Sequence, residues 1–236
     1  MKKVLILACI IVISTVLTFS SSFLTPNGGI IEEGYLYFDT FNPAWGIKWG
    51  LFGFLETGIS QVNQGAYLKA GFNEINQIPL KFSVFYSNTF NLLSSISAIL
   101  GYDFGNIYSD IGILYSQEKQ WDEDNSQYEL IGNYSTFAKA NIKIIEREES
   151  DSYINIEGSL NLSEDFNVNN YMMAFYGVQN FKNRAWIFEG INLYAGVAIK
   201  NDFDTKFNLA ENISVVLGLS TKIKVFWFIV VKNSKP

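Results

Sequence analysis

The chain has 236 residues and a net charge of −6, with 23 Asp and Glu against 17 Lys and Arg and no histidine. Nucleic-acid binding needs a basic footprint, which this acidic chain lacks, and imidazole bases and imidazole metal ligands are excluded outright. Only 17% of the residues are charged, against roughly 25% in soluble domains. The chain therefore has too little charge to coat a water-exposed surface.

The first 22 residues are expected to form a cleaved signal peptide. Lys2 and Lys3 precede an apolar run from Val4 to Leu17, and small polar residues suited to cleavage follow at 18–22. The run is shorter than the roughly 20 residues of a spanning helix, although an uncleaved anchor remains an alternative. Cys9, the only cysteine, follows Leu-Ala as in a lipobox but lies too early, so we interpret it as an ordinary signal residue.

Residues 23–236 carry the pattern of a sheet with two unlike faces. Apolar and polar residues alternate over about ten positions between clusters of Asn, Gly, Asp and Ser, which predicts strands. The clearest lie at 66–73, 78–87, 95–103, 153–162, 191–200 and 212–220. All runs from Glu33 to Val231 give about 12 strands, with 10 as the alternative.

The predicted connectors are short, and one of them strains the strand count. Short connectors are expected at 61–64, 105–106, 146–152 and 221–222, and the longest at Gln117–Gln127. The longest would follow the sixth strand and so lie on the periplasmic side, whereas long barrel loops usually lie outside the cell. Either the strand at 34–41 is not part of the wall or this chain ignores that tendency.

The polar face is mostly Ser, Gly, Asn and Tyr, and such small polar residues suit a crowded barrel interior. If the polar face of each strand points into the barrel, the charged residues expected to line the lumen are Lys48, Glu56, Lys69, Lys81, Asp103, Asp110, Glu129, Lys139, Lys143, Glu157 and Lys200, with Lys224 as a further candidate. They either form ion pairs that fill a closed interior or line a narrow water path with slight anion preference.

Aromatic residues make up 16% of the chain and recur near predicted strand ends, where interfacial girdles lie in membrane barrels. The candidates are Trp45, Trp49, Tyr86, Tyr102, Tyr115, Trp186 and Trp227; the alternative is ordinary core packing.

The export signal, the tandem ten-residue strands and the glycine-rich polar face together resemble small bacterial outer-membrane β-barrel proteins. The segment Gly50–Ser60 (GLFGFLETGIS) is similar to a strand of several such barrels. The resemblance implies an all-β fold in which residues 23–236 form a single antiparallel up-and-down transmembrane barrel of 10–12 strands. It also implies a location in the cell outer membrane, with the lipid bilayer and the barrel-assembly machinery as partners. The chain departs from the pattern at its end, because Phe226-Trp227-Phe228 is followed by a polar tail instead of ending on an aromatic residue.

The predicted function is that of a narrow pore or a structural or surface protein, without catalysis, cofactor, metal or nucleic-acid partner. No carboxylate pair shares a strand face at hydrolase-like spacing, and the acidic stretch at 122–125 is interpreted as a solvated loop tip. The alternative is a secreted or periplasmic soluble barrel with an apolar cavity lined by Ile154, Ile156, Leu160, Leu193 and Val197. A third possibility is a β-domain anchored in the inner membrane. The sequence indicates no oligomeric state.

Overall fold

The computed structural model describes residues 25–42, 45–61, 65–75, 77–89, 93–122, 127–185, 188–203 and 205–225. The predicted signal peptide, Trp186, Trp227 and the aromatic triplet at 226–228 lie outside these ranges. Within them, no helix is long and apolar enough to cross a membrane.

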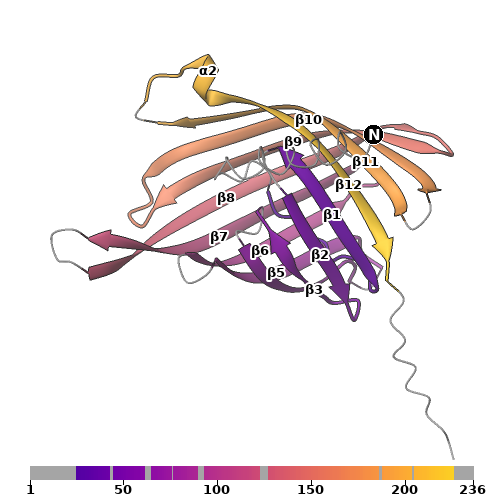
Figure 1. The fold of residues 1–236 in the computed structure, drawn as a ribbon, viewed down its shortest axis with the longest axis horizontal. Helices are drawn as coiled ribbons and strands as arrows, with labels where there is room; N and C mark the ends of the chain where they lie inside the picture. The colour runs from indigo at the N-terminus through magenta and orange to yellow at the C-terminus, as the bar shows by residue number, and fades with distance from the viewer. Residues whose placement is uncertain are drawn as a thin grey trace, which may run out of the picture.

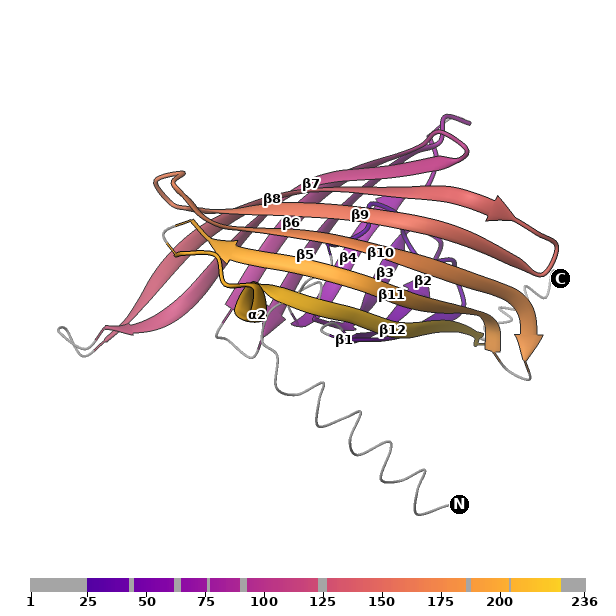
Figure 2. The same cartoon turned by 90° about the horizontal axis from the view of Figure 1, so that it is seen from above.

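Twelve strands of the described chain form one closed antiparallel barrel, as Figures 1 and 2 show. Each strand pairs with the next along the sequence, and β1 pairs with β12 to close the ring. The strands are β1 (Tyr35–Asn42), β2 (Trp45–Leu51), β3 (Leu55–Ser60), β4 (Gly65–Phe72), β5 (Leu80–Thr89), β6 (Leu93–Asp103), β7 (Ile107–Asp122), β8 (Gln127–Glu146), β9 (Ser150–Ser163), β10 (Val168–Ala185), β11 (Phe188–Asp202) and β12 (Ile213–Lys224); the short helix α2 (Leu209–Asn212) connects the last two. The predicted all-β up-and-down barrel and the count of 12 are confirmed.

The barrel wall is low on one side and tall on the other (Figure 1). Strand β3 has 6 residues and β8 has 20, which correspond to about 20 Å and about 66 Å of extended chain. With an even number of strands, β1 begins and β12 ends at the same end of the barrel, which we call the terminal end. The β7–β8 hairpin, the β9–β10 turn and α2 lie at the opposite end (Figure 1).

Two sequence predictions about connections are wrong. Gly50–Ser60 is not one strand: it holds the end of β2, the turn Phe52–Phe54 and all of β3. Phe52 and Gly53 have φ of 55° and 70°, the left-handed backbone that a tight hairpin turn needs and that glycine adopts readily. Likewise, the predicted connector at 221–222 lies inside β12, where Thr221 pairs with Phe38 and Ile191.

The longest predicted connector is mostly strand. Asp122 pairs with Gln127, so β7 and β8 continue through most of 117–127. Pairing of β7 with β6 ends at Glu118, and pairing of β8 with β9 begins at Asn133. Residues 119–122 and 127–130 therefore pair only with each other and form a ribbon that projects beyond the wall (Figure 1). Because the extra turn inside Gly50–Ser60 adds a strand, this ribbon follows the seventh strand and lies opposite the terminal end.

Candidate functional site

Three carboxylates of the barrel interior are almost completely buried and come from three separate strands. Glu56 on β3, Asp110 on β7 and Glu157 on β9 are 3%, 1% and 1% exposed. Their strands alternate as the sequence predicts, so the neighbours of each carboxylate point outward. A buried carboxylate is costly unless donors surround it. The partners of these three groups therefore indicate what the interior is built to hold.

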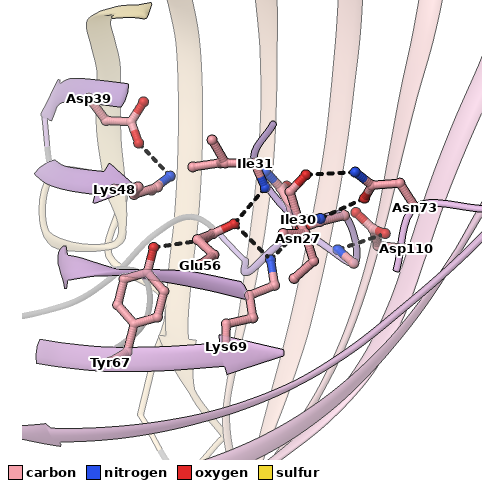
Figure 3. Close-up of polar contacts among 12 residues, drawn as sticks. Asn27, Ile30, Ile31, Asp39, Lys48, Glu56, Tyr67, Lys69, Asn73 and Asp110 are labelled. Atoms are coloured by element: carbon pink, nitrogen blue, oxygen red, sulfur yellow. Dashed lines mark hydrogen bonds and ion pairs between the residues drawn. The ribbon is translucent and has the colours of Figure 1, made fainter. Parts of the chain in front are cut away.

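Those partners come largely from the chain just before β1. Residues 25–31, which we call the plug segment, run through the lumen from the β9 side toward β2. The Thr25 amide and hydroxyl both donate to Glu157 Oε2, at 2.6 and 2.9 Å. The Gly28 amide donates to Asp110 Oδ1 at 3.0 Å, and the Ile31 amide donates to Glu56 Oε2 at 3.1 Å (Figure 3).

Side chains from the intervening wall complete the seat of the plug segment. Lys139 Nζ on β8 donates to Asn27 Oδ1 at 2.8 Å, and Lys69 on β4 donates to the Gly29 carbonyl. Asn73, just after β4, binds Ile30 twice: Asn73 Oδ1 accepts from the amide at 2.6 Å and Asn73 Nδ2 donates to the carbonyl at 2.8 Å (Figure 3). The contacts thus follow the wall in order from β9 to β3.

Two glycines of the wall allow the plug segment to approach this closely. A Cβ at Gly50 would collide with the Ile31 and Glu32 carbonyl oxygens, where the chain passes over β2 on its way to β1. A Cβ at Gly101 on β6 would collide with the Asp110 carboxylate that binds Gly28. Close backbone approach is the usual reason for glycine inside a strand.

Lysines form ion pairs with two of the three interior carboxylates. Lys69 Nζ lies 3.6 Å from Glu56 Oε2, and Lys139 Nζ lies 3.5 Å from Glu157 Oε1. The tyrosine hydroxyls of Tyr67 and Tyr176 donate to Glu56 and Glu157. These contacts satisfy acceptors that the plug segment leaves free, as buried ionised groups require.

A cavity of about 570 Å³ lies between the plug segment and the opposite wall. Its surface away from the plug segment is mainly hydroxyl and amide, and includes Tyr37, Tyr153, Asn155, Tyr176, Asn180, Asn192, Tyr194 and Ser220. Two ion pairs, Lys48 with Asp39 and Lys69 with Glu56, also line it (Figure 3). This part of the lumen is therefore polar but carries few net charges.

Apolar side chains fill other parts of the interior, which the sequence analysis did not anticipate. Phe85, Ile99, Leu114 and Phe137 form one buried cluster on β5–β8. A second cluster on β10–β12 contains Met172, Ala174, Tyr176, Val178, Ala198 and Val216. Gly112 gives a usable sequence signal, because a Cβ there would overlap the Phe137 ring. An inward glycine beside alternating apolar residues thus marks a large side chain on the next strand.

The charged residues expected in the lumen divide into four groups by position. Lys48, Glu56, Lys69, Lys81 and Lys139 line the cavity, and Asp110 and Glu157 are buried against the plug segment. Asp103, Lys143 and Lys200 lie near strand ends: Asp103 Oδ1 accepts from Gly105 N at 2.8 Å, and Lys143 Nζ contacts Glu146 Oε2 at 3.3 Å. Glu129 is exposed on the projecting ribbon and pairs across it with Gln120, so it does not lie in the lumen. Lys224 lies at the end of β12, over the Tyr35 ring.

The outer face of the barrel is apolar and exposed. Leu68, Ile111 and Val215 are 55%, 58% and 55% exposed. Every strand from β2 to β12 contributes at least one exposed apolar side chain; examples are Ile47, Ile59, Leu68, Val84, Ile96, Ile111, Ile144, Ile156, Met173, Val197 and Val215. Soluble monomers rarely expose contiguous apolar surface of this kind.

Aromatic pairs occur toward both ends of the barrel. At the terminal end, Phe52 contacts Phe54, Phe72 contacts Phe82, and Tyr102 contacts Phe104, with ring centroids 6.2, 5.7 and 4.5 Å apart. Toward the opposite end, Tyr134 lies 4.9 Å from Tyr115 and 5.0 Å from Phe166. Among the predicted girdle residues, Tyr102 and Tyr115 thus lie toward opposite ends.

Comparison with known proteins gives one solved structure to report. No family model matches the sequence, and the curated proteins contain no match to it. Among solved structures, the chain is similar to one described as "NanC porin structure in rhombohedral crystal form". The identity is 7% and the TM-score 0.42, and the match covers 82% of this chain and 99% of the other.

Proposed function

We propose that this protein spans a bacterial-type outer membrane as a β-barrel with a filled interior, and that it serves as a structural or surface protein without catalytic activity. The observation that carries the proposal is the inverted distribution of side chains. Apolar residues of eleven strands face outward and exposed, whereas carboxylates, lysines and serines are buried inside. That distribution matches lipid outside the wall, because closure leaves no unpaired strand edge in the hydrocarbon.

The ends of the barrel support an orientation. With both termini on the periplasmic side, the turns at 52–54, 104–106 and 147–149 are periplasmic and short. The projecting ribbon and α2 are then extracellular, as is typical of the longer connections in such barrels. The aromatic pairs toward the two ends fit the two interfacial girdles.

The filled interior favours a closed barrel over a wide channel. The plug segment occupies the β3–β9 side of the lumen, and the two apolar clusters occupy other parts of it. Glu56 and Glu157 accept from plug-segment amides and tyrosine hydroxyls, and Asp110 accepts through Oδ1 from the Gly28 amide and the Tyr108 hydroxyl, so these carboxylates serve as acceptors that hold the plug segment. A narrow pore through the polar cavity is the second candidate, and the cavity lined by tyrosine and asparagine favours it.

The soluble-carrier alternative makes a specific structural prediction that is wrong. It requires Ile156, Leu160, Leu193 and Val197 to line an internal cavity, yet all four are exposed on the outer face. A carrier would need the opposite phasing of every strand, and a one-residue shift in register would invert both faces.

The test is lipid contact measured one residue at a time. The only cysteine of the chain is Cys9, in the predicted signal peptide, so single cysteines can be introduced elsewhere and labelled with a fluorophore. The positions are Ile111, Val215 and the buried Ser83. The labelled variants are then placed in vesicles of brominated lipid, which quenches a fluorophore that it contacts. We expect strong quenching at Ile111 and Val215 and weak quenching at Ser83. Equal quenching at all three positions, or none, would rule out a lipid-facing outer wall.

A further inference from the structure

The plug segment is bound in the manner of a peptide ligand. None of the strand pairings of the described barrel includes residues 25–31. Instead, wall side chains accept from the amides of Thr25, Gly28, Ile30 and Ile31 and donate to the carbonyls of Gly29 and Ile30. Most of these contacts bind the backbone of a segment that bends at Gly28 and Gly29. The Thr25 hydroxyl and Asn27 Oδ1 add two side-chain contacts, to Glu157 and Lys139.

The centre of the seat selects small residues. A Cβ at Gly28 would lie 2.6 Å from Asp110 Oδ1 and 3.2 Å from the Gly101 amide nitrogen, which is wall backbone and cannot move aside. A Cβ at Gly29 would lie 3.1 Å from Asn73 Oδ1. Ile30, by contrast, is 5% exposed and supplies an apolar anchor. The site therefore fits a peptide with two adjacent glycines followed by an aliphatic residue.

The wall closes without the plug segment. Barrel closure uses Tyr35 to Asn42, which pair with Leu217 to Lys224. The chain enters β1 at Gly34, where the Gly34 amide donates to the Gly50 carbonyl at 3.1 Å and the Gly34 carbonyl accepts from the Val225 amide at 2.7 Å. Both bonds lie beyond residue 31, so displacing the plug segment leaves the ring of strands intact.

We propose that the barrel interior is a binding site for a peptide that bends at two adjacent glycines, that this chain occupies it with its own residues 25–31, and that this plug segment can be displaced from the folded wall. The site is built from Glu56, Lys69, Asn73, Asp110, Lys139 and Glu157. This proposal goes beyond the proposed function. It rests on the proposed function only because the site requires a folded barrel.

The experiment vacates the site and refills it from solution. Gly28→Leu places a side chain against Asp110 and Gly101, which drives the plug segment out of its seat. The matched control is Gly158→Leu, because a Cβ at Gly158 lies 3.7 Å from its nearest neighbour, the Met172 carbonyl oxygen, on the outward face of β9. The probe is a fluorescent peptide with the sequence of residues 25–32, Thr-Pro-Asn-Gly-Gly-Ile-Ile-Glu. Its anisotropy is titrated with full-length protein in detergent, after the heat-shifted gel band has established that each variant is folded.

We expect the peptide to bind the Gly28→Leu variant but neither the unchanged protein nor the Gly158→Leu control. A peptide with both glycines replaced by leucine should not bind. Adding Asp110→Asn to Gly28→Leu should weaken binding about tenfold, which corresponds to about 1.4 kcal/mol, because a charged acceptor of the central amide is lost.

Three results would overturn the proposal: equal binding to the unchanged protein, no binding to folded Gly28→Leu, or equal binding of the leucine-substituted peptide. Since Gly28→Leu could prevent folding, Ile30→Glu is a second variant that expels the plug segment, because it places a carboxylate at a position that is 5% exposed and holds an apolar side chain. If neither variant gives a heat-shifted band while the unchanged protein does, the wall needs its plug segment and displacement is refuted. The proposed function fails separately, through the absence of a heat shift in the unchanged protein.

Discussion

Glu157 makes four described polar contacts, one more than Glu56, and its replacement by leucine is a quantitative test of the interior. Its carboxylate accepts from the Thr25 amide and hydroxyl and from the Tyr176 hydroxyl, and lies 3.5 Å from Lys139 Nζ. Lys139 is 12% exposed, and after the change Asn27 Oδ1 is its remaining partner at hydrogen-bond distance. Breaking one partner of a buried ion pair costs about 3–5 kcal/mol of unfolding free energy, and that is the loss we expect.

The compensating change is Lys139→Met in the same chain. The double variant removes the uncompensated ammonium and leaves the Tyr176 hydroxyl and the Thr25 amide without their acceptor, at a residual cost of about 1–3 kcal/mol. The double variant should therefore be about 2 kcal/mol more stable than Glu157→Leu alone. The assay is equilibrium urea unfolding in lipid vesicles, followed by tryptophan fluorescence. A loss below about 1 kcal/mol for Glu157→Leu, or a double variant less stable than the single one, would refute the reasoning.

Three further predictions follow from the wall and the ribbon. Ile111→Arg should lower the free energy of unfolding in lipid by about 2–4 kcal/mol, because it places a charge on the outward face. The control Glu129→Arg, on the exposed ribbon, should change the free energy of urea unfolding by less than about 0.5 kcal/mol, and equal effects would contradict the assignment of the faces. Gly112→Leu should lower the free energy of unfolding by about 1–3 kcal/mol, because the new side chain overpacks against the Phe137 ring. Adding Phe137→Ala should recover part of that loss in the same assay, and purely additive losses would contradict this packing. Replacing residues 120–129 by a two-residue turn should leave the heat-shifted gel band in place, because the ribbon pairs only with itself; loss of the band would mean that the wall depends on the ribbon.

The alternation of side chains was sufficient to predict the wall, since it depends on local sequence alone. Ile156 and Leu160 alternate with Asn155 and Glu157, and two unlike faces of this kind occur only where one face meets lipid or a core. The inward placement of Glu56, Lys69 and Asp110 also follows from this phasing. Alternation could not distinguish a continuous strand over Gly50–Ser60 from two strands with a turn. Gly53 is only one of three glycines in this run, and Phe52, the other residue with a left-handed backbone (φ of 55°), carries no turn signal.

The plug segment could not be predicted from local sequence. Thr25 and Glu157 are 132 residues apart, and their contact joins a backbone amide to a side chain, so no periodic pattern records it. The two glycines at 28 and 29 are the only local trace, and they resemble an ordinary turn. The apolar inner clusters were hidden for a related reason: Phe85 and Phe137 occupy inward positions that the phasing assigned to a polar face, and their packing depends on space left by Gly112 on another strand.

The central claim is that the apolar face of the closed barrel lies in a membrane, and the most direct measurement is the gel mobility of the membrane fraction with and without boiling. Expressing cells are fractionated, the membranes are extracted with detergent, and the two samples are run side by side. The account predicts a protein that requires detergent for solubility and whose band shifts on heating, because a closed barrel resists unfolding by detergent until it is boiled. A protein that stays soluble without detergent and shows no heat shift would contradict the account.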